Sequence, residues 1–169
     1  LERAGKVGVV VLDKTGMITK GQPAVTDIVT DGEVEPDELL RYAASVEKGS
    51  EHPLGEAIWA AASGRGLSLA EPQGFQAEVG LGVEAEVDGR RVAVGNLRMA
   101  EARGFAPNGL TAAVERLQGE AKTAMLVALD GSVQGVIAVA DTVKDSSQAA
   151  IDDLRRMGLR VAMITGDNR

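Results

Sequence analysis

The chain has 169 residues with 18 Lys and Arg against 25 Asp and Glu, and its net charge of −7 disfavours nucleic-acid and anionic-membrane partners. With 44% hydrophobic residues it can bury one core or two small ones, but no apolar run reaches the about 18 residues of a membrane helix. Cysteine is absent and His52 is the one histidine, which excludes disulfide scaffolds and cysteine-based zinc sites.

The first predicted element is a strand over residues 7–12, a near-continuous run of β-branched residues. Such a run is typical of a strand buried on both faces of a parallel sheet. It ends in a polar, glycine-containing loop at 13–16. A second strand is predicted over 24–30, and prolines at first helical positions predict helices over 36–46 and 54–62.

The middle of the chain alternates between apolar and polar residues, which predicts half-buried strands. Two Asp-Gly pairs, Asp88-Gly89 and Asp130-Gly131, each lie between two such strands and predict hairpin turns. The elements predicted here, in chain order, are strands 76–79, 83–87 and 90–94, helices 97–103 and 111–119, and strands 123–129 and 132–139. This part of the chain is therefore expected to form an antiparallel sheet with helices packed on it.

The last part of the chain, like the first, has an apolar strand that ends in a polar, glycine-containing loop. A helix is predicted over 144–157, closed by Gly158, and an apolar strand over 160–164 precedes Thr165-Gly166-Asp167. Active sites in open α/β sheets lie beyond the carboxyl ends of the strands. This loop and the loop at 13–16 are therefore expected to lie close together. The predicted organisation is an α/β domain, residues 1–22 and 140–169, interrupted by an antiparallel α+β domain, residues 23–139.

Asp13 stands at the end of the first predicted strand, where its carboxylate can act as a nucleophile toward phosphorus. The backbone N–H groups of the turn and the side chain of Lys14 can hold phosphoryl oxygens as negative charge develops on them. The product of such an attack is an acyl phosphate. An Asp-rich turn after a strand is also common without any catalytic role.

Several motifs, taken in chain order, resemble those of the P-type ATPases, and in particular their heavy-metal-transporting subgroup. The resemblance covers essentially the whole chain and implies a haloacid-dehalogenase-like (Rossmann-type) domain, present in part, interrupted by an antiparallel α+β nucleotide-binding domain. The motifs are Asp13-Lys14-Thr15-Gly16, Ser50-Glu51-His52-Pro53-Leu54, Gly80-Leu81-Gly82, Gly95-Asn96 and Thr165-Gly166-Asp167.

The resemblance implies a catalytic group at the carboxyl ends of the first and last strands. Asp13 is implied as the phosphorylated residue, and its carboxylate together with the main-chain carbonyl of Thr15 is implied to bind Mg²⁺. Thr15 replaces a second acid of soluble dehalogenase-like hydrolases, so a group that could activate water is lost. The implied catalytic residues are Asp13, Lys14, Thr15, Thr165, which donates its hydroxyl to the phosphate, Gly166, and Asp167 at the hinge and nucleotide side.

The same resemblance implies that the interrupting domain binds ATP. Glu47 and His52 are implied to contact adenine, and a carboxyl with an imidazole can recognise the edge of the ring without an aromatic stack. Gly80 and Gly82 are expected to let the backbone approach the nucleotide, where a side chain would collide with it. Asn96 is expected to offer its amide to the ribose or the phosphates.

The implied function is the ATP-binding and phosphorylation region of a copper-exporting P-type ATPase. The implied partners are ATP with Mg²⁺ and the actuator and transmembrane domains of the same pump, with the heavy-metal ion bound elsewhere. The implied location is the cytoplasmic part of an integral membrane protein. The family's downstream Gly-Asp-Gly-x-x-Asn-Asp segment does not occur within these 169 residues, so weak nucleotide binding and little turnover are expected of this piece.

Two other functions stay open on sequence grounds. A soluble dehalogenase-type phosphatase is disfavoured by Thr15, and release of phosphate from small phosphoesters would identify it. A nucleotide-sensing domain without catalysis is kept open by Met17, which stands where the family's motif has a threonine. Phosphoenzyme formation would separate that function from the pump.

Overall fold

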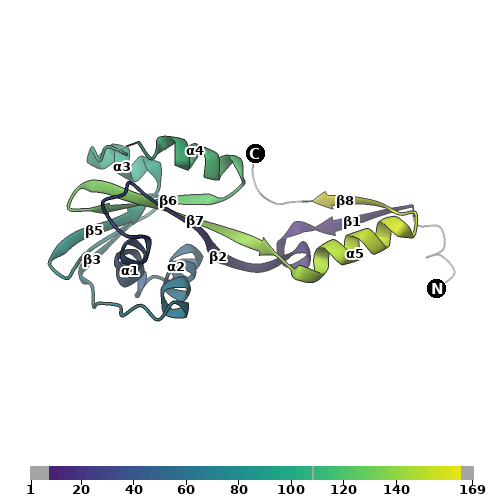
Figure 1. The fold of residues 1–169 in the computed structure, drawn as a ribbon, viewed down its shortest axis with the longest axis horizontal. Helices are drawn as coiled ribbons and strands as arrows, with labels where there is room; N and C mark the ends of the chain where they lie inside the picture. Colours follow the sequence, from purple (N-terminus) through teal and green to yellow (C-terminus); the bar gives the residue numbers. More distant parts are fainter. Residues whose placement is uncertain (1–7, 108, 165–169) are drawn as a thin grey trace. The chain divides into compact units, whose positions relative to one another are not determined.

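The computed structural model describes residues 8–107 and 109–164, which divide into two compact units (Figure 1). One unit combines Leu1–Pro23 with Asp141–Arg169, and the other is Ala24–Ala140. Among the described residues, no helix combines the length and the apolar character needed to cross a membrane.

The first unit is built on a parallel pair of strands. Strand β1 (Val9–Asp13) pairs with β8 (Arg160–Ile164), and Asp13 stands opposite Ile164. Both strands therefore end at the same edge of the sheet, as the sequence predicts. Helix α5 (Asp145–Arg156) packs against β8.

The prediction that the first strand is buried on both faces is wrong for the described residues. Val11 is 52% exposed, whereas its neighbours Val10 and Leu12 are half-buried. This alternation arises because the two-stranded sheet carries α5, and the described residues supply no second layer. An apolar run thus predicts the strand but not which of its faces is covered.

The second unit is built on a six-stranded sheet in the order β2-β7-β6-β5-β4-β3, in which neighbouring strands from β3 to β7 are antiparallel. Two Asp-Gly turns join β4 to β5 and β6 to β7, as predicted. The strands are β2 (Thr19–Thr30), β3 (Gln73–Glu78), β4 (Gly82–Val87), β5 (Arg90–Gly95), β6 (Thr123–Leu129) and β7 (Ser132–Val143).

Three strands are longer than the sequence predicts by two residues or more. Strand β2 begins at Thr19 rather than 24, since an edge strand tolerates glycine and proline, and β7 continues to Val143. Strand β3 begins at Gln73 rather than 76, because an irregularity between Gln73 and Gln76 interrupts the alternation by which strands are recognised.

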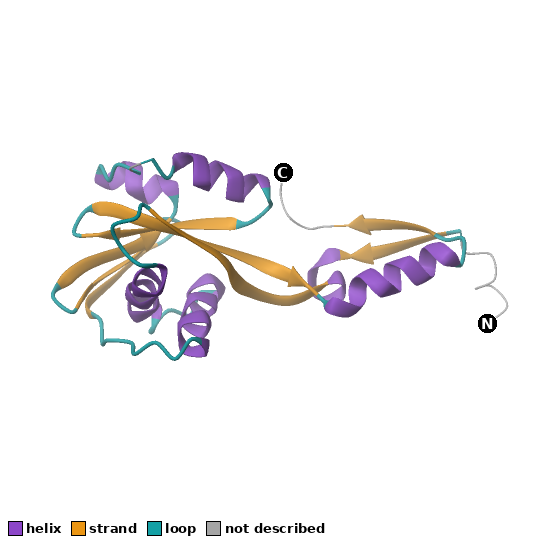
Figure 2. Cartoon of the chain, in the orientation of Figure 1, coloured by secondary structure: helices purple, strands orange, loops and turns teal. Residues whose placement is uncertain are grey.

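Two pairs of helices cover the two faces of this sheet (Figure 2). Helices α1 (Pro36–Glu47) and α2 (Pro53–Gly64) pack on one face, and α3 (Leu97–Arg103) and α4 (Thr111–Gly119) on the other. Each helix begins and ends within two residues of its predicted bounds. Asn96 and Gly104 at the ends of α3 explain its agreement, because they cap its two ends.

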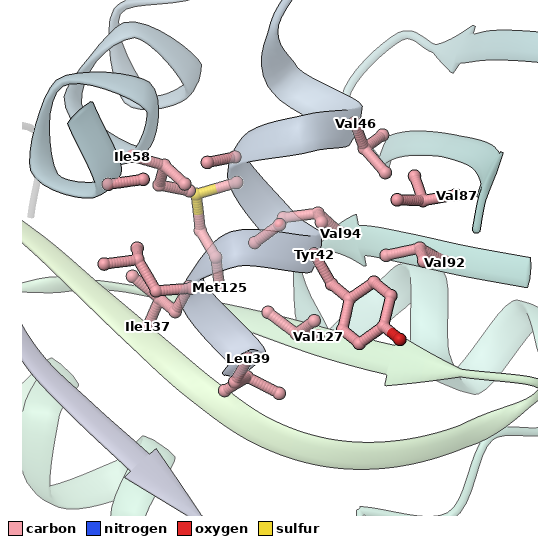
Figure 3. Close-up of a cluster of buried hydrophobic side chains, with 14 of the residues drawn as sticks. Leu39, Tyr42, Val46, Ile58, Val87, Val92, Val94, Met125, Val127 and Ile137 are labelled. Carbon is pink, nitrogen blue, oxygen red and sulfur yellow. The ribbon is translucent and has the colours of Figure 1, made fainter. Parts of the chain in front are cut away.

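The apolar residues of the strands alternate between the two cores. Val92 and Val94 face α1 and α2, whereas Ala93 between them belongs to the core under α3 and α4. Figure 3 shows the first core, where Leu39 from α1 and Ile58 from α2 lie close to the side chains of the sheet. Each large side chain buried there contributes about 1.5–3 kcal/mol. The sheet is thereby a firm support for the loops at its end.

Candidate functional site

A cavity of about 680 Å³ lies in the second unit. Its volume is in the range of pockets that bind small ligands. Its walls come from the α1–α2 loop, the β3–β4 turn, the β5–α3 junction and β6. The five residues predicted to bind nucleotide all line it: Glu47, His52, Gly80, Gly82 and Asn96.

Glu47 is the last residue of α1 and is 4% exposed. Its Oε2 atom has no hydrogen-bond partner among the described residues. Burial raises the pKa of the Glu47 carboxyl, while a hydrogen bond from Ser50 and the charge of His52 act in the opposite direction. Room for the carboxyl is left by Gly55, where a Cβ atom would overlap Oε2 and lie 2.8 Å from the Ser50 hydroxyl oxygen.

His52 is the N-cap of α2. Its Nδ1 accepts from the backbone N–H of Leu54 at 3.2 Å, and its own N–H donates to the hydroxyl of Ser50 at 3.2 Å. Pro53 then occupies the first helical position, where no N–H is needed. A neutral imidazole that accepts at Nδ1 carries its proton on Nε2, so the ring brings a donor to the cavity wall.

The two predicted glycines of the β3–β4 turn differ in what surrounds them. Gly80 has φ +76°, and a Cβ atom there would meet nothing within 4 Å. At Gly82 a Cβ atom would overlap the carbonyl oxygen of Val94 and lie 2.6 Å from Gly95 Cα and 2.9 Å from Met99 Sδ. The structural reason for glycine at 82 is therefore close packing of β4 on β5 and α3, which differs from the predicted reason of access for a ligand.

Asn96 joins the glycine turn to α3. Its Oδ1 accepts from Met99 N at 3.1 Å, its Nδ2 donates to Gly80 O at 2.7 Å, and its own N–H donates to Leu81 O at 2.9 Å. The side chain thus fixes the cavity wall from within the protein. A contact between its amide and a ribose or phosphate stays a prediction.

In the other unit, Asp13 ends β1 and its carboxylate is exposed. Its Oδ1 accepts from the N–H of Thr15 at 3.4 Å, a long hydrogen bond that leaves the carboxylate weakly held. Gly16 turns the chain with φ +75°. The remaining predicted catalytic residues, Thr165, Gly166 and Asp167, lie outside the described residues.

A hydrogen-bond network closes the loop that follows Asp13. The buried hydroxyl of Thr19 donates to Asp141 Oδ2 at 2.5 Å and accepts from Gly16 N at 3.2 Å. The second oxygen of Asp141 accepts from Gly21 N at 3.0 Å, and the Nζ of Lys144 donates to Gly16 O at 2.6 Å. Asp141 and Lys144, which follow the second unit in the chain, therefore hold the loop that follows Asp13.

Substitutions at 17 and 19 test which hydroxyl holds this loop. Thr19→Val keeps the side-chain shape but leaves Asp141 Oδ2 and Gly16 N without this partner, so we expect a loss of about 1–3 kcal/mol in unfolding free energy. Met17 is 55% exposed, so Met17→Thr is expected to change stability by at most about 0.5 kcal/mol. Urea unfolding measures both, and a Thr19→Val protein as stable as the parent would contradict the network.

The oxygen atoms next to Asp13 are suited to Mg²⁺ but are few. The carboxylate of Asp13 and the carbonyl of Thr15 are hard ligands, and Mg²⁺ commonly keeps several waters and binds through one or two carboxylates plus substrate phosphates. The described residues contain no cluster of three or more acidic or histidine side chains that could form a full protein cage. The donor set fits a metal shared with a phosphorylated substrate.

Sequence reasoning missed several residues of both sites. Thr19 and Asp141 are separated by 122 positions, so no local pattern connects them. Phe75 is 42% exposed and lines the cavity, and the sequence reasoning assigned it no place in the nucleotide site. Phe75 lies just before the strand predicted over 76–79, so no predicted element included it. Ser50 is the first residue of the Ser50–Leu54 motif and Gly55 directly follows it. Their nearness to His52 was the only sequence signal that they belong to the site.

Comparison with known proteins places the chain. A family model described as haloacid dehalogenase-like hydrolase matches residues 7–169. The chain belongs to the haloacid dehalogenase-like hydrolases. This dehalogenase-like chain is also 45% identical over 169 residues to a copper-exporting P-type ATPase of Bacillus subtilis (strain 168), which covers all of this chain and 21% of that protein. The chain thus spans about one fifth of that relative's length.

Solved structures agree with the sequence matches. A zinc-transporting PIB-type ATPase in the E2.Pi state has a TM-score of 0.91 at 34% identity, covering 99% of this chain and 27% of that chain. The N-domain of HMA8, a copper-transporting P-type ATPase, has a TM-score of 0.58 at 34% identity, covering 69% of this chain and 99% of that chain. The predicted fold class, a haloacid-dehalogenase-like α/β domain interrupted by an antiparallel α+β domain, is confirmed.

Proposed function

We propose that Ala24–Ala140 binds ATP and that the unit containing Asp13 accepts its γ-phosphate, as domains of a copper-exporting P-type ATPase. The observation that carries the proposal is the cavity, because all five residues predicted to bind the nucleotide, which come from separate stretches of the chain, line it. The likeness to copper-exporting P-type ATPases over the whole chain supports the choice of parent protein.

In this proposal adenine lies between Glu47 and His52. The space beside Gly80, which has no side chain, lets the nucleotide approach the protein backbone there. An Asp13 oxygen attacks the γ-phosphorus, the bond from phosphorus to the bridging oxygen breaks, and ADP leaves with that electron pair. Mg²⁺ held by the Asp13 carboxylate and the Thr15 carbonyl would supply positive charge to the transferring group. Thr15 offers no carboxylate to activate water, so the acyl phosphate persists.

The proposed parent is an integral membrane pump with this chain on its cytoplasmic side, where ATP is present. Its actuator and transmembrane domains are the proposed partners, and the copper ion binds in those other parts. Formation and hydrolysis of the acyl phosphate would then be coupled to transport by movement of these domains.

An NMR titration of the ¹⁵N-labelled chain with ATP, ADP and GTP tests the nucleotide site. We expect shifts at Glu47, His52, Gly80 and Asn96 that are larger with ATP and ADP than with GTP. His52→Asn keeps a good N-cap for α2 but removes the Nε2 donor, so the Kd for ATP is expected to rise about tenfold. Equal affinity of the variant and the parent, or shifts that avoid the cavity, would contradict the proposal.

A further inference from the structure

Phe75 is an exposed aromatic residue on the wall of the cavity. It is 42% exposed, and among the described residues it is the one phenylalanine, tyrosine or tryptophan that lines the cavity. The chain's other three, Tyr42, Trp59 and Phe105, lie elsewhere. A phenyl ring in contact with water gains free energy when a flat apolar group covers it, so Phe75 offers a binding surface to a ligand of that shape.

Phe75 lies in an irregular part of β3, which is an edge strand of the six-stranded sheet. The stretch Gln73–Gln76 of β3 pairs with the shorter stretch Glu84–Glu86 of β4, so β3 carries one extra residue there. This is the geometry of a β-bulge, and Gly74 has the positive φ, +63°, that such a bulge can place on glycine. Bulges are frequent next to functional sites, where they redirect a side chain.

The side chain of Phe75 belongs to the face of the sheet that carries α1 and α2. Residues two apart on a strand share a face, and Phe75 and Ala77 both line the cavity whereas Gln76 between them does not. Ala77 pairs with Val83, which packs against the core under α1 and α2. The α1–α2 loop contributes His52 to the same cavity. An aromatic face and an imidazole donor therefore border one space.

The charge of the cavity wall favours an uncharged ligand group. The ionisable side chains that line the cavity are Glu47, Glu51, Glu78 and His52, and no lysine or arginine of the described residues is among them. The exposed carboxylates of Glu51 and Glu78 repel phosphate groups but not an uncharged base. The affinity of the cavity for a nucleotide must then come from contacts with the faces and edges of the base.

We propose that Phe75 is the stacking surface for the adenine ring, with its phenyl face against the face of the base. This inference rests on the proposed function, since it adds a ligand contact to the same nucleotide site. Stacking contributes affinity whatever groups the edge of the base carries, because every base has an aromatic face. The edge is left to polar groups such as the imidazole of His52, so substitution can separate the two contacts.

Phe75→Leu and Phe75→Trp test the inference in the 169-residue chain. Leucine keeps an apolar side chain but has no aromatic face, so the Kd for ATP is expected to rise about tenfold. The same rise is expected for adenosine, because the contact is with the base and not with the phosphates. Tryptophan presents a larger aromatic face, so its Kd is expected to be no higher than the parent's.

Trp59→Leu is the matched control. Trp59 lies in α2 and is 44% exposed, close to the value for Phe75, but it does not line the cavity, so its replacement is expected to leave both Kd values unchanged. The nucleotide's own proton spectrum gives a second readout. A phenyl face shifts the protons stacked on it upfield, so H2 and H8 of bound adenine are expected upfield with the parent and with Trp59→Leu, and less so with Phe75→Leu. The ¹H–¹⁵N spectrum of each variant establishes that it is folded.

The results separate this inference from the proposed function. If folded Phe75→Leu binds ATP or adenosine as tightly as the parent, or leaves the H2 and H8 shifts unchanged, the inference is overturned while the nucleotide site stands. If the parent chain binds neither ATP nor adenosine, the proposed function fails and the inference fails with it.

Discussion

Asp13→Asn is expected to abolish phosphoenzyme formation in the full-length transporter proposed to contain this chain. The amide nitrogen that replaces one oxygen cannot form the acyl phosphate, and no other carboxylate is presented by the loop that Thr19 and Asp141 close. Incorporation of ³²P from γ-labelled ATP into membranes, followed by an acid gel, measures the effect. The acyl phosphate is also expected to be cleaved by hydroxylamine.

Asp145→Asn is the matched control for that experiment. Asp145 is exposed and lies in the same unit, at the first turn of α5, so its replacement removes the same charge without touching the loop. The control is expected to retain phosphorylation, and Asp13→Asn to change unfolding free energy by at most about 0.5 kcal/mol, because the exposed carboxylate is weakly held. Label on Asp13→Asn would contradict its role, whereas an unlabelled parent would favour a nucleotide-sensing domain.

The local chemistry of the chain was enough to predict most of its elements. Helix α3 and strand β8 have the predicted bounds, because caps and turn residues mark their ends in the sequence itself. The same holds for the Asp-Gly hairpin at Asp88-Gly89, where both residues have positive φ, as a tight hairpin requires. These features depend on neighbours in the chain, which sequence reasoning can see.

Features set by distant partners were not predictable. The start of β2 at Thr19 depends on its position at a sheet edge, and the exposure of Val11 depends on which layers cover β1. The link between Thr19 and Asp141 joins the two segments that flank the second unit. In the cavity, the motif identified His52, and Glu47 was suggested only by its position five residues before it; the burial of the Glu47 carboxyl against Gly55 is seen only in the structure.

Gly82→Ala is expected to destabilise the second unit by about 3 kcal/mol or more. The added methyl group would overlap the carbonyl oxygen of Val94 and press on Gly95 Cα, and both are backbone atoms of a paired strand that cannot rotate away. The β4–β5 ladder would have to separate where it forms the cavity wall. Urea unfolding followed by circular dichroism measures the loss, and nucleotide binding should fall with it.

Gly80→Ala separates that packing role from access for a ligand. A methyl group at Gly80 meets no protein atom within 4 Å, so its cost is limited to the strain of φ +76°, about 1–2 kcal/mol. The variant is expected to stay folded but to bind ATP less well, since the methyl group occupies open space at the cavity wall. If Gly82→Ala is as stable as the parent, Gly82 is not required for packing. If Gly80→Ala binds ATP as well as the parent, Gly80 is not required for access of the ligand.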